Sequence, residues 1–216
     1  LTGLVTHGDE VLVGDPMYAT YEAVIRAPGA APVAVPLRPE HGFRMRAEDV
    51  AARITPSSRV LFLNTPHNPT GAVLTRDDLM ALGRLARDHD LWILSDEVYE
   101  ELIFGGEFLS PLDIAEFAER TIAVSSISKS HAAPGFRSGW AVGPGEFMAR
   151  LLPVAETMLF GNQPFIADAT ALAVSHPSPV APGMVERFSR RAKLIKAALQ
   201  GVNALHVHEP EAGMFT

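Results

Sequence analysis

Lys129, in the stretch "SSISKS", is the residue of this chain best suited to covalent chemistry. It is the only lysine in the first 192 residues, where arginine supplies the other cationic side chains. A lysine amine can form an imine with an aldehyde, whereas a guanidinium stays protonated at ordinary pH. Most lysines are simply surface residues, but this one follows an apolar run closely and stands among serines. We therefore interpret Lys129 as a candidate imine-forming residue.

The neighbours of this lysine could hold a phosphate. Ser126, Ser128 and Ser130 flank it, and Arg137 follows eight residues later. Hydroxyl and guanidinium groups donate hydrogen bonds to phosphate oxygens, and the guanidinium adds its charge. An imine-forming lysine beside a phosphate site predicts pyridoxal 5′-phosphate, an aldehyde that carries a phosphate.

Four further side chains could act on this cofactor, and each has a simpler alternative. Asp96 ends the apolar run "LWILSD", where an anion would keep the pyridine nitrogen protonated; it could equally cap a helix beginning at Glu97. Asn68, in the turn "NTPHNPTG", and Tyr99 could donate hydrogen bonds to the phenolic oxygen, although a single tyrosine more often packs in a core. Tyr18 could stack on the flat ring or only pack against its neighbours.

The elements that would position these residues indicate an α/β fold with a mostly parallel sheet covered by helices. A helix is expected over 75–90, with Thr75 and Asp78 as its capping pair. After residue 144 helices predominate, including a long one over 182–202. Ligands bind at the carboxyl ends of parallel strands, so the polar segments that close the strands should meet at one edge. The expected strands cover residues 10–15, 31–37, 59–64, 91–96, 121–126 and 139–143.

Composition narrows the class of protein further. The chain has 216 residues, 47% of them apolar, with a net charge of −7 and no cysteine. This balance argues against a nucleic-acid partner or a polybasic membrane surface, and it excludes disulfides and thiolate metal sites. We expect a cytoplasmic protein with no membrane span. The opening "LTGLVTHGDEV" is typical of a helix end and the closing "EPEAGMFT" of a strand beginning, so we expect a fragment cut at both ends.

The remaining candidates are weaker. His67 and His131 lie close to Asn68 and Lys129 and could contact substrate, but packing at the rim of the site is the simpler interpretation. His206 and His208 alternate as on a strand without a third ligand in range, so we expect no metal site. The basic side chains of 190–196 are typical of a solvated helix face.

Three motifs together resemble one family. Asn-Pro-Thr-Gly at 68–71, Ser-Asp-Glu-Val-Tyr at 95–99 and Ser-x-Ser-Lys-x7-Arg-x-Gly at 126–139 follow the order and spacing of the fold-type I aminotransferases, class I/II, aspartate-aminotransferase-like. The similarity covers essentially the whole chain. Within the family, "MYATYEAV", "SDEVYEEL" and "SKSHAAPGFRSGW" look most like the arginine–pyruvate transaminase branch.

The resemblance implies pyridoxal-phosphate-dependent transamination between an L-amino acid and a 2-oxo acid of the pyruvate or 2-oxoglutarate type. It also implies a homodimer with active sites at the subunit interface. It assigns the imine and the proton shuttle to Lys129, the pyridine nitrogen to Asp96, the phenolic oxygen to Asn68 and Tyr99, the phosphate to Ser126 and Arg137, and ring stacking to Tyr18.

The resemblance further implies a domain division and several missing parts. Residues 1–185 would form the cofactor-binding large domain, and 186–216 the interdomain helix and the beginning of a smaller α+β domain. The phosphate loop should precede Leu1, and the arginine that binds the substrate carboxylate should follow Thr216. The N-terminal arm and a tyrosine lent by the partner subunit are also absent from this sequence.

The turn around Asn68 carries a geometric expectation. Asn68–Pro69 should be cis, because the chain must reverse sharply there and because this bond is cis in the family that the chain resembles. Asp15–Pro16 is a second candidate for a cis bond. Thr65–Pro66 should be trans.

Two other functions remain open. One is a β-eliminating C–S lyase of the same fold, although Tyr99 and the "GFRSGW" stretch favour a transaminase. The other is the pyridoxal-phosphate-sensing domain of a transcription regulator. A basic winged-helix segment upstream of Leu1 would indicate the regulator.

Overall fold

The computed structural model describes residues 1–215 and contains a six-stranded sheet in the order β2-β1-β3-β4-β5-β6. Neighbouring strands are parallel from β2 through β5, and β6 runs antiparallel to β5. The mostly parallel sheet that the apolar runs predict is therefore confirmed, with boundaries within about one residue. The strands are β1 (Glu10–Asp15), β2 (Ala31–Pro36), β3 (Ser58–Asn64), β4 (Trp92–Asp96), β5 (Thr121–Ser126) and β6 (Gly139–Val142).

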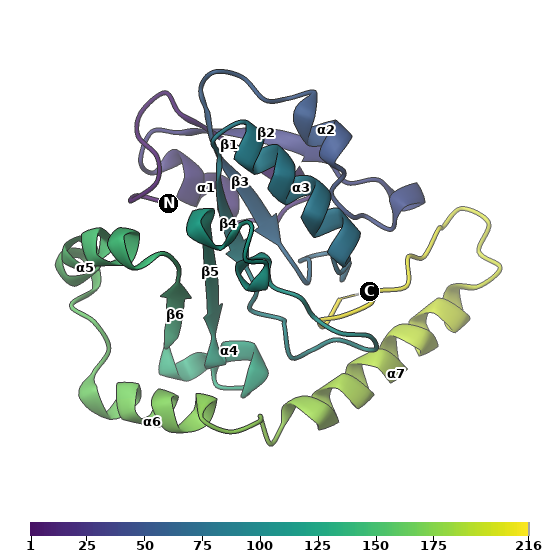
Figure 1. The fold of residues 1–216 in the computed structure, drawn as a ribbon. Coiled ribbons are helices and arrows are strands. Elements are labelled where there is room, and N and C mark those ends of the chain that lie inside the picture. Colours follow the sequence, from purple (N-terminus) through teal and green to yellow (C-terminus); the bar gives the residue numbers. More distant parts are fainter. Residues whose placement is uncertain (216) are drawn as a thin grey trace.

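Helices cover both faces of the sheet (Figure 1). Short 3₁₀ turns lie at Pro39–His41, Pro111–Asp113, Ala118–Arg120 and Pro134–Phe136. The α-helices are α1 (Tyr21–Arg26), α2 (Ala47–Ala51), α3 (Arg76–Asp88), α4 (Ile127–Ser130), α5 (Gly145–Leu159), α6 (Pro164–Val174) and α7 (Ala181–Leu199).

Strand β3 shows why its run is apolar without alternation. Leu61 and Leu63 belong to the core cluster that includes residues of α2 and α3. Val60 and Phe62 belong to the cluster on the opposite face, which includes Ile25 of α1. Successive side chains of a strand point to opposite faces, so a strand covered on both sides must be apolar at every position.

Helix α3 begins where its capping signal predicts. The Thr75 side chain accepts a hydrogen bond from the Asp78 amide at 3.2 Å, and Asp78 Oδ2 accepts one from the Thr75 amide at 3.0 Å. These two bonds satisfy amides that the first turn of a helix leaves unpaired. The predicted capping pair is confirmed.

The C-terminal part of the chain is helical until α7 ends, and it then turns back toward the sheet (Figure 1). The strand expected in "EPEAGMFT" is a single antiparallel bridge between Ala212 and Ile103 among the described residues. Thr216, the last residue of that segment, lies outside the described part of the chain. Over residues 1–215, no helix is both long and apolar enough to cross a membrane.

Candidate active site

The carboxyl ends of the central strands bring together polar residues that are far apart in the sequence. Asn64 at the end of β3 pairs in register with Asp96 at the end of β4. Asp96 in turn pairs with Val124 of β5, two residues before Ser126. The convergence expected at one sheet edge is therefore present.

A cavity of about 580 Å³ opens at this edge. All seven candidate cofactor residues line it: Tyr18, Asn68, Asp96, Tyr99, Ser126, Lys129 and Arg137. The lining also includes Met214 and Phe215 from the C-terminal segment. Residues from nearly the whole length of the chain thus face one common space.

Lys129 is positioned by the single-turn helix α4. Ser126 precedes this helix as its N-cap, and its hydroxyl accepts a hydrogen bond from the Ser128 amide at 3.3 Å. The Lys129 ammonium lies 5.7 Å from the centre of the Tyr99 ring. The amine therefore faces the cavity next to the ring of a second candidate residue.

Asp96 presents a carboxylate held from two sides. Tyr21 donates its hydroxyl to Asp96 Oδ2 at 2.6 Å, and the Val98 amide donates to Oδ1 at 3.2 Å. Burial raises the pKa of Asp96, while these two hydrogen bonds oppose the rise. The alternative interpretation of Asp96 as a helix cap is wrong, because residues 98–101 form a turn and no helix begins at Glu97.

Tyr21 is a site residue that the sequence did not identify. Its ring packs edge-on to Tyr18 at 5.4 Å and belongs to the core, while its hydroxyl reaches Asp96. The two tyrosines of "MYATYEA" stand three residues apart, which is a weak sign that both could face one site. Helical spacing alone is also typical of core packing, so nothing in the sequence distinguished the roles.

The Asn68 turn is fixed by Asn64. The Asn64 amide donates to the Asp96 carbonyl at 3.1 Å and to the Pro66 carbonyl at 3.2 Å, while its oxygen accepts from the Asn68 amide at 2.8 Å. Asn64 thereby joins the end of β3 to both β4 and the turn. Sequence reasoning placed Asn64 at the sheet edge but gave it no such role.

In the part of the chain that the structure describes, three X–Pro bonds are cis: Asp15–Pro16, Thr65–Pro66 and Asn68–Pro69. The first and third match expectation, and the prediction of a trans Thr65–Pro66 bond is wrong. Thr65 is held on both sides, since its amide donates to the Asp96 carbonyl at 3.1 Å and its hydroxyl accepts from the Leu74 amide at 3.1 Å. Thr65 is thereby tied both to the end of β4 and to the segment that leads into α3.

Tyr99 is both packed and placed at the cavity. Only 4% of it is exposed, and its ring contacts Phe215 edge-on at 5.1 Å. Burial raises the pKa of Tyr99 to about 12, the neighbouring Asp96 and Tyr18 add to this, and the Asn68 side chain opposes it. The Tyr99 hydroxyl therefore stays protonated near neutral pH and can donate a hydrogen bond.

The cavity lining also carries hydroxyl groups and a guanidinium. Ser126, Ser128 and Arg137 line it, and Arg137 Nη1 donates to the Pro134 carbonyl at 2.9 Å. Ser130 does not belong to this group, contrary to expectation. It is buried, and its hydroxyl lies 2.9 Å from His131 Nδ1, because side chains two residues apart in a helix, such as Ser128 and Ser130, point to nearly opposite sides.

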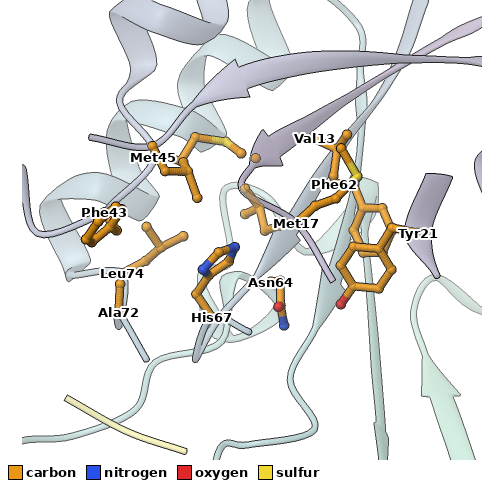
Figure 2. A pocket seen from close by; sticks show the side chains of 13 residues that line it. Val13, Met17, Tyr21, Phe43, Met45, Phe62, Asn64, His67, Ala72 and Leu74 are labelled. Carbon is orange, nitrogen blue, oxygen red and sulfur yellow. The ribbon is translucent and has the colours of Figure 1, made fainter. Parts of the chain in front are cut away.

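His67 lies deeper than its expected place at the rim. It lines a separate cavity of about 20 Å³, room for little more than one water molecule, together with apolar side chains such as Met45 and Leu74 (Figure 2). Burial lowers the pKa of His67 to about 4, and a hydrogen bond to the Pro16 carbonyl partly opposes the shift. His67 is therefore a neutral core residue near pH 7. The expectation of rim packing is wrong for His67.

His131 and His208 each contact a neighbouring residue of the protein. His131 is absent from the lining of the large cavity, and its Nε2 lies 3.1 Å from the Ala173 carbonyl. His208 contacts the Phe43 ring at 4.9 Å. Within the described 215 residues, no group of three or more potential metal ligands occurs. The basic residues of α7 lie on its exposed side, where Lys196 pairs with Glu209.

The fold and the site together define a class: an α/β protein that gathers a lysine, a buried carboxylate and several hydrogen-bond donors at the strand ends. The chain belongs to the aminotransferase class I and II family, whose pattern it matches over residues 1–216. It is 49% identical over 212 residues to the arginine–pyruvate transaminase AruH of Pseudomonas aeruginosa, covering 98% of this chain and 54% of that protein.

Two solved structures are similar throughout the chain. An aspartate aminotransferase double mutant from Thermus thermophilus superposes with a TM-score of 0.88 at 33% identity, over 98% of this chain and 56% of that one. The N-succinyldiaminopimelate aminotransferase from Mycobacterium tuberculosis gives the same TM-score of 0.88 at 33% identity, over 98% and 56%. The chain thus spans about half the length of the relatives it matches.

Proposed function

We propose that the protein catalyses amino transfer between an L-amino acid and a 2-oxo acid, with pyridoxal 5′-phosphate as its cofactor. The observation that carries the proposal is the single cavity in which Lys129, Asp96, Asn68, Tyr99, and the Ser126–Arg137 group meet. Family membership and the names of the relatives support the same conclusion.

The residues present fit this cofactor. The aldehyde of the cofactor reacts with an amine, its pyridine nitrogen pairs with an anion, and its phosphate binds hydroxyls and a cation. The cavity offers Lys129 for the first, Asp96 for the second, and Ser126 with Arg137 for the third. Asp96 is buried enough for its pKa to rise, so a cationic ring nitrogen beside it would restore its ionised form. A neutral ligand without a nitrogen cation would leave this buried carboxylate without such compensation.

When bound, the cofactor supplies a carbonyl that condenses with amines and a ring that accepts electrons from the substrate α-carbon. Lys129 would hold the cofactor through its amine and would also be the group that accepts and donates the proton at the substrate α-carbon. Asp96 keeps the ring nitrogen protonated. Asn68 and Tyr99 donate hydrogen bonds to the phenolic oxygen.

The remaining residues orient the cofactor. Ser126 and Arg137 bind the phosphate, and Tyr18, whose side chain is 42% exposed at the mouth of the cavity, stacks on the ring. This arrangement holds the reacting carbon near Lys129 and lowers the entropic cost of the reaction.

We extend the proposal to the domain division of this chain and to the assembly and substrates of the whole protein. Residues 1–185 form the large domain and 186–216 lead into the smaller one, and the active protein is a cytoplasmic homodimer with its sites at the subunit interface. Arginine is the favoured amino donor and pyruvate the favoured acceptor, because the relative that is 49% identical carries that name. No nucleic acid or membrane partner is proposed.

The test uses the intact protein with pyridoxal 5′-phosphate and a panel of L-amino acids, each with pyruvate or 2-oxoglutarate. We expect oxo-acid-dependent amino transfer, and borohydride should fix the cofactor on Lys129. Lys129→Ala should still bind cofactor but lose this attachment and the transfer. Fixation on another lysine would overturn the assignment of Lys129. Release of pyruvate and a thiol without an acceptor would identify a β-eliminating lyase instead.

A further inference from the structure

The C-terminal segment 211–213 lies between the two turns that carry Asn68 and Tyr99. The Glu211 amide donates to the Gly71 carbonyl at 3.0 Å, and the Glu211 carbonyl accepts from the Phe104 amide at 2.8 Å. One residue farther on, Ala212 forms the antiparallel bridge to Ile103. This segment therefore joins the exit of the Asn68 turn to the chain that follows Tyr99.

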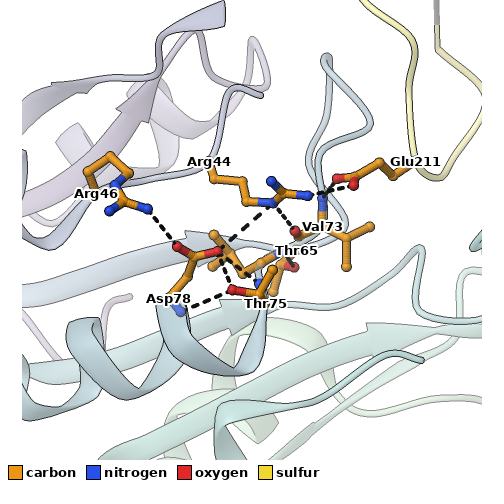
Figure 3. Close-up of polar contacts among 8 residues, drawn as sticks. Arg44, Arg46, Thr65, Val73, Thr75, Asp78 and Glu211 are labelled. Carbon is orange, nitrogen blue, oxygen red and sulfur yellow. Dashed lines mark hydrogen bonds and ion pairs between the residues drawn. The ribbon is translucent and has the colours of Figure 1, made fainter. Parts of the chain in front are cut away.

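The Glu211 side chain closes a second set of contacts (Figure 3). Glu211 Oε1 accepts from Arg44 Nη2 at 2.5 Å, and Oε2 accepts from the Val73 amide at 3.0 Å. Arg44 Nε also donates to the Val73 carbonyl at 2.8 Å. Arg44, Val73 and Glu211 thus form a closed ring of hydrogen bonds, which we call the Arg44 clamp.

The Arg44 clamp is linked to the first turn of helix α3 through Asp78. Arg44 Nε lies 3.9 Å from Asp78 Oδ2, and Asp78 also pairs with Arg46 at 3.1 Å (Figure 3). Asp78 is the capping residue in the first turn of α3 and is 8% exposed. Movement of Glu211 therefore has to disturb contacts that extend to the beginning of a core helix.

The Asn68 turn and the C-terminal segment are packed closely at Gly71. Gly71 has a φ of +72°, and a Cβ there would lie 2.4 Å from Pro210 Cβ and 2.7 Å from the Ala212 carbonyl oxygen. Beyond the bridge, Phe215 packs on the Tyr99 ring and lines the large cavity. The segment is thus in contact with the Asn68 turn on one side and with Tyr99 on the other.

We propose that Glu211 is a positioning residue that sets the spacing between Asn68 and Tyr99 through the Arg44 clamp. This inference rests on the proposed function, in which both side chains donate to one oxygen of the cofactor. Two donors can reach one atom together only if their turns are held at a fixed separation. The Thr65 amide donates to the Asp96 carbonyl and so joins the two turns where they leave the sheet, whereas segment 211–213 joins their far ends, at Gly71 and at residues 102–104.

The experiment compares Glu211→Ala and Glu211→Gln with the control Glu209→Ala in the intact protein. Glu209 lies two residues before Glu211, but its carboxylate pairs with exposed Lys196 on α7 and not with the clamp. Amide hydrogen exchange is measured without cofactor over 68–73 and 102–104. We expect exchange there to accelerate roughly tenfold in Glu211→Ala, less in Glu211→Gln, and not in Glu209→Ala.

The second measurement is the pH midpoint of the absorbance change of bound pyridoxal 5′-phosphate. Hydrogen bonds to the phenolic oxygen of the cofactor stabilise its negative charge and lower the pKa of the cofactor's titrating group. If Glu211→Ala weakens these bonds, the midpoint should rise by about half a unit or more. Glu211→Gln keeps one acceptor oxygen, so its midpoint should lie between those of the wild type and Glu211→Ala. It also serves as the milder variant if Glu211→Ala folds poorly. Glu209→Ala should match the wild type.

The outcomes distinguish failure of the clamp proposal from failure of the proposed function. Faster exchange with an unchanged midpoint would show a purely structural contact and overturn the positioning role. Unchanged exchange, or equal effects in Glu209→Ala, would overturn the clamp itself. Failure of borohydride to fix the cofactor on Lys129 in the wild type would instead refute the proposed function, while the exchange result still decides the clamp.

Discussion

The Tyr21 hydroxyl donates to Asp96 Oδ2 at 2.6 Å across 75 residues of sequence and joins helix α1 to the end of strand β4. Burial and the neighbouring Asp96 carboxylate raise the pKa of Tyr21, so the phenol remains protonated and acts as the donor. The same hydrogen bond opposes the burial-driven rise in the pKa of Asp96. Tyr21 therefore orients the carboxylate and favours its ionised form.

Tyr21→Phe keeps the ring in the core and removes only this hydrogen bond. Because the bond favours the carboxylate, the pKa of Asp96 should rise further, and the acidic limb of the pH–activity profile should move to higher pH. We expect turnover to fall roughly tenfold and the free energy of unfolding by about 1 kcal/mol. Steady-state kinetics from pH 5 to 9 would check this, and an unchanged acidic limb would contradict it.

Asp96→Asn should damage activity far more than folding. A neutral amide cannot keep the ring nitrogen of the cofactor protonated, although it can still accept from Tyr21. We expect at least about a 100-fold loss of turnover, the size typical for removal of one electrostatic stabiliser. Circular dichroism and thermal unfolding should stay near those of the wild type. Turnover close to that of the wild type would show that Asp96 only shapes the turn after β4.

Glu97 makes stability depend on pH. Burial raises its pKa to about 7 from an ordinary 4.5, and the Ser95 and Ser110 hydroxyls oppose this while Glu100 and Asp113 add to it. The cost of ionising a buried acid is absent below pH 4.5 and complete above about pH 7. Glu97→Gln should therefore gain stability relative to the wild type as the pH rises through that window, by up to about 3 kcal/mol.

Denaturant unfolding of both proteins from pH 4 to 8 would measure this difference. His67 imposes the opposite slope, because its lowered pKa destabilises the fold as the pH falls from 6.5 toward 4. It is present in both proteins, so it cancels from the comparison. Exposed Glu101→Gln controls for removing one negative charge from the same turn. A Glu97→Gln difference that stays flat with pH would refute the prediction.

Gly71→Ala should disrupt the contact between the Asn68 turn and segment 210–212. The positive φ disfavours alanine, and the added methyl would lie 2.4 Å from Pro210. We expect a loss of about 2 kcal/mol or more in unfolding free energy. Gly105→Ala is the matched control, since nothing lies within 4 Å of its Cβ position. Equal stability of both variants, measured by denaturant unfolding, would show that the segment yields easily.

Much of the fold could be predicted from local patterns. The run around Leu61 and Phe62 identified β3 because a strand covered on both faces is apolar at every position. Thr75 and Asp78 identified the start of α3 because the cap is made by residues three apart. Lys129 was conspicuous because no other lysine occurs in the first 192 residues, and its chemistry differs from that of arginine.

Other features were decided only by the tertiary structure. The direction of Ser130 away from the cavity, the burial of His67 and the cis Thr65–Pro66 bond depend on what each residue meets across space. The Tyr21–Asp96 hydrogen bond and the Arg44–Glu211 pair join residues 75 and 167 positions apart. Periodicity and capping report contacts within one turn of helix or one strand. Contacts between distant elements depend on how helices and loops pack on the finished sheet, and no local pattern contains that geometry.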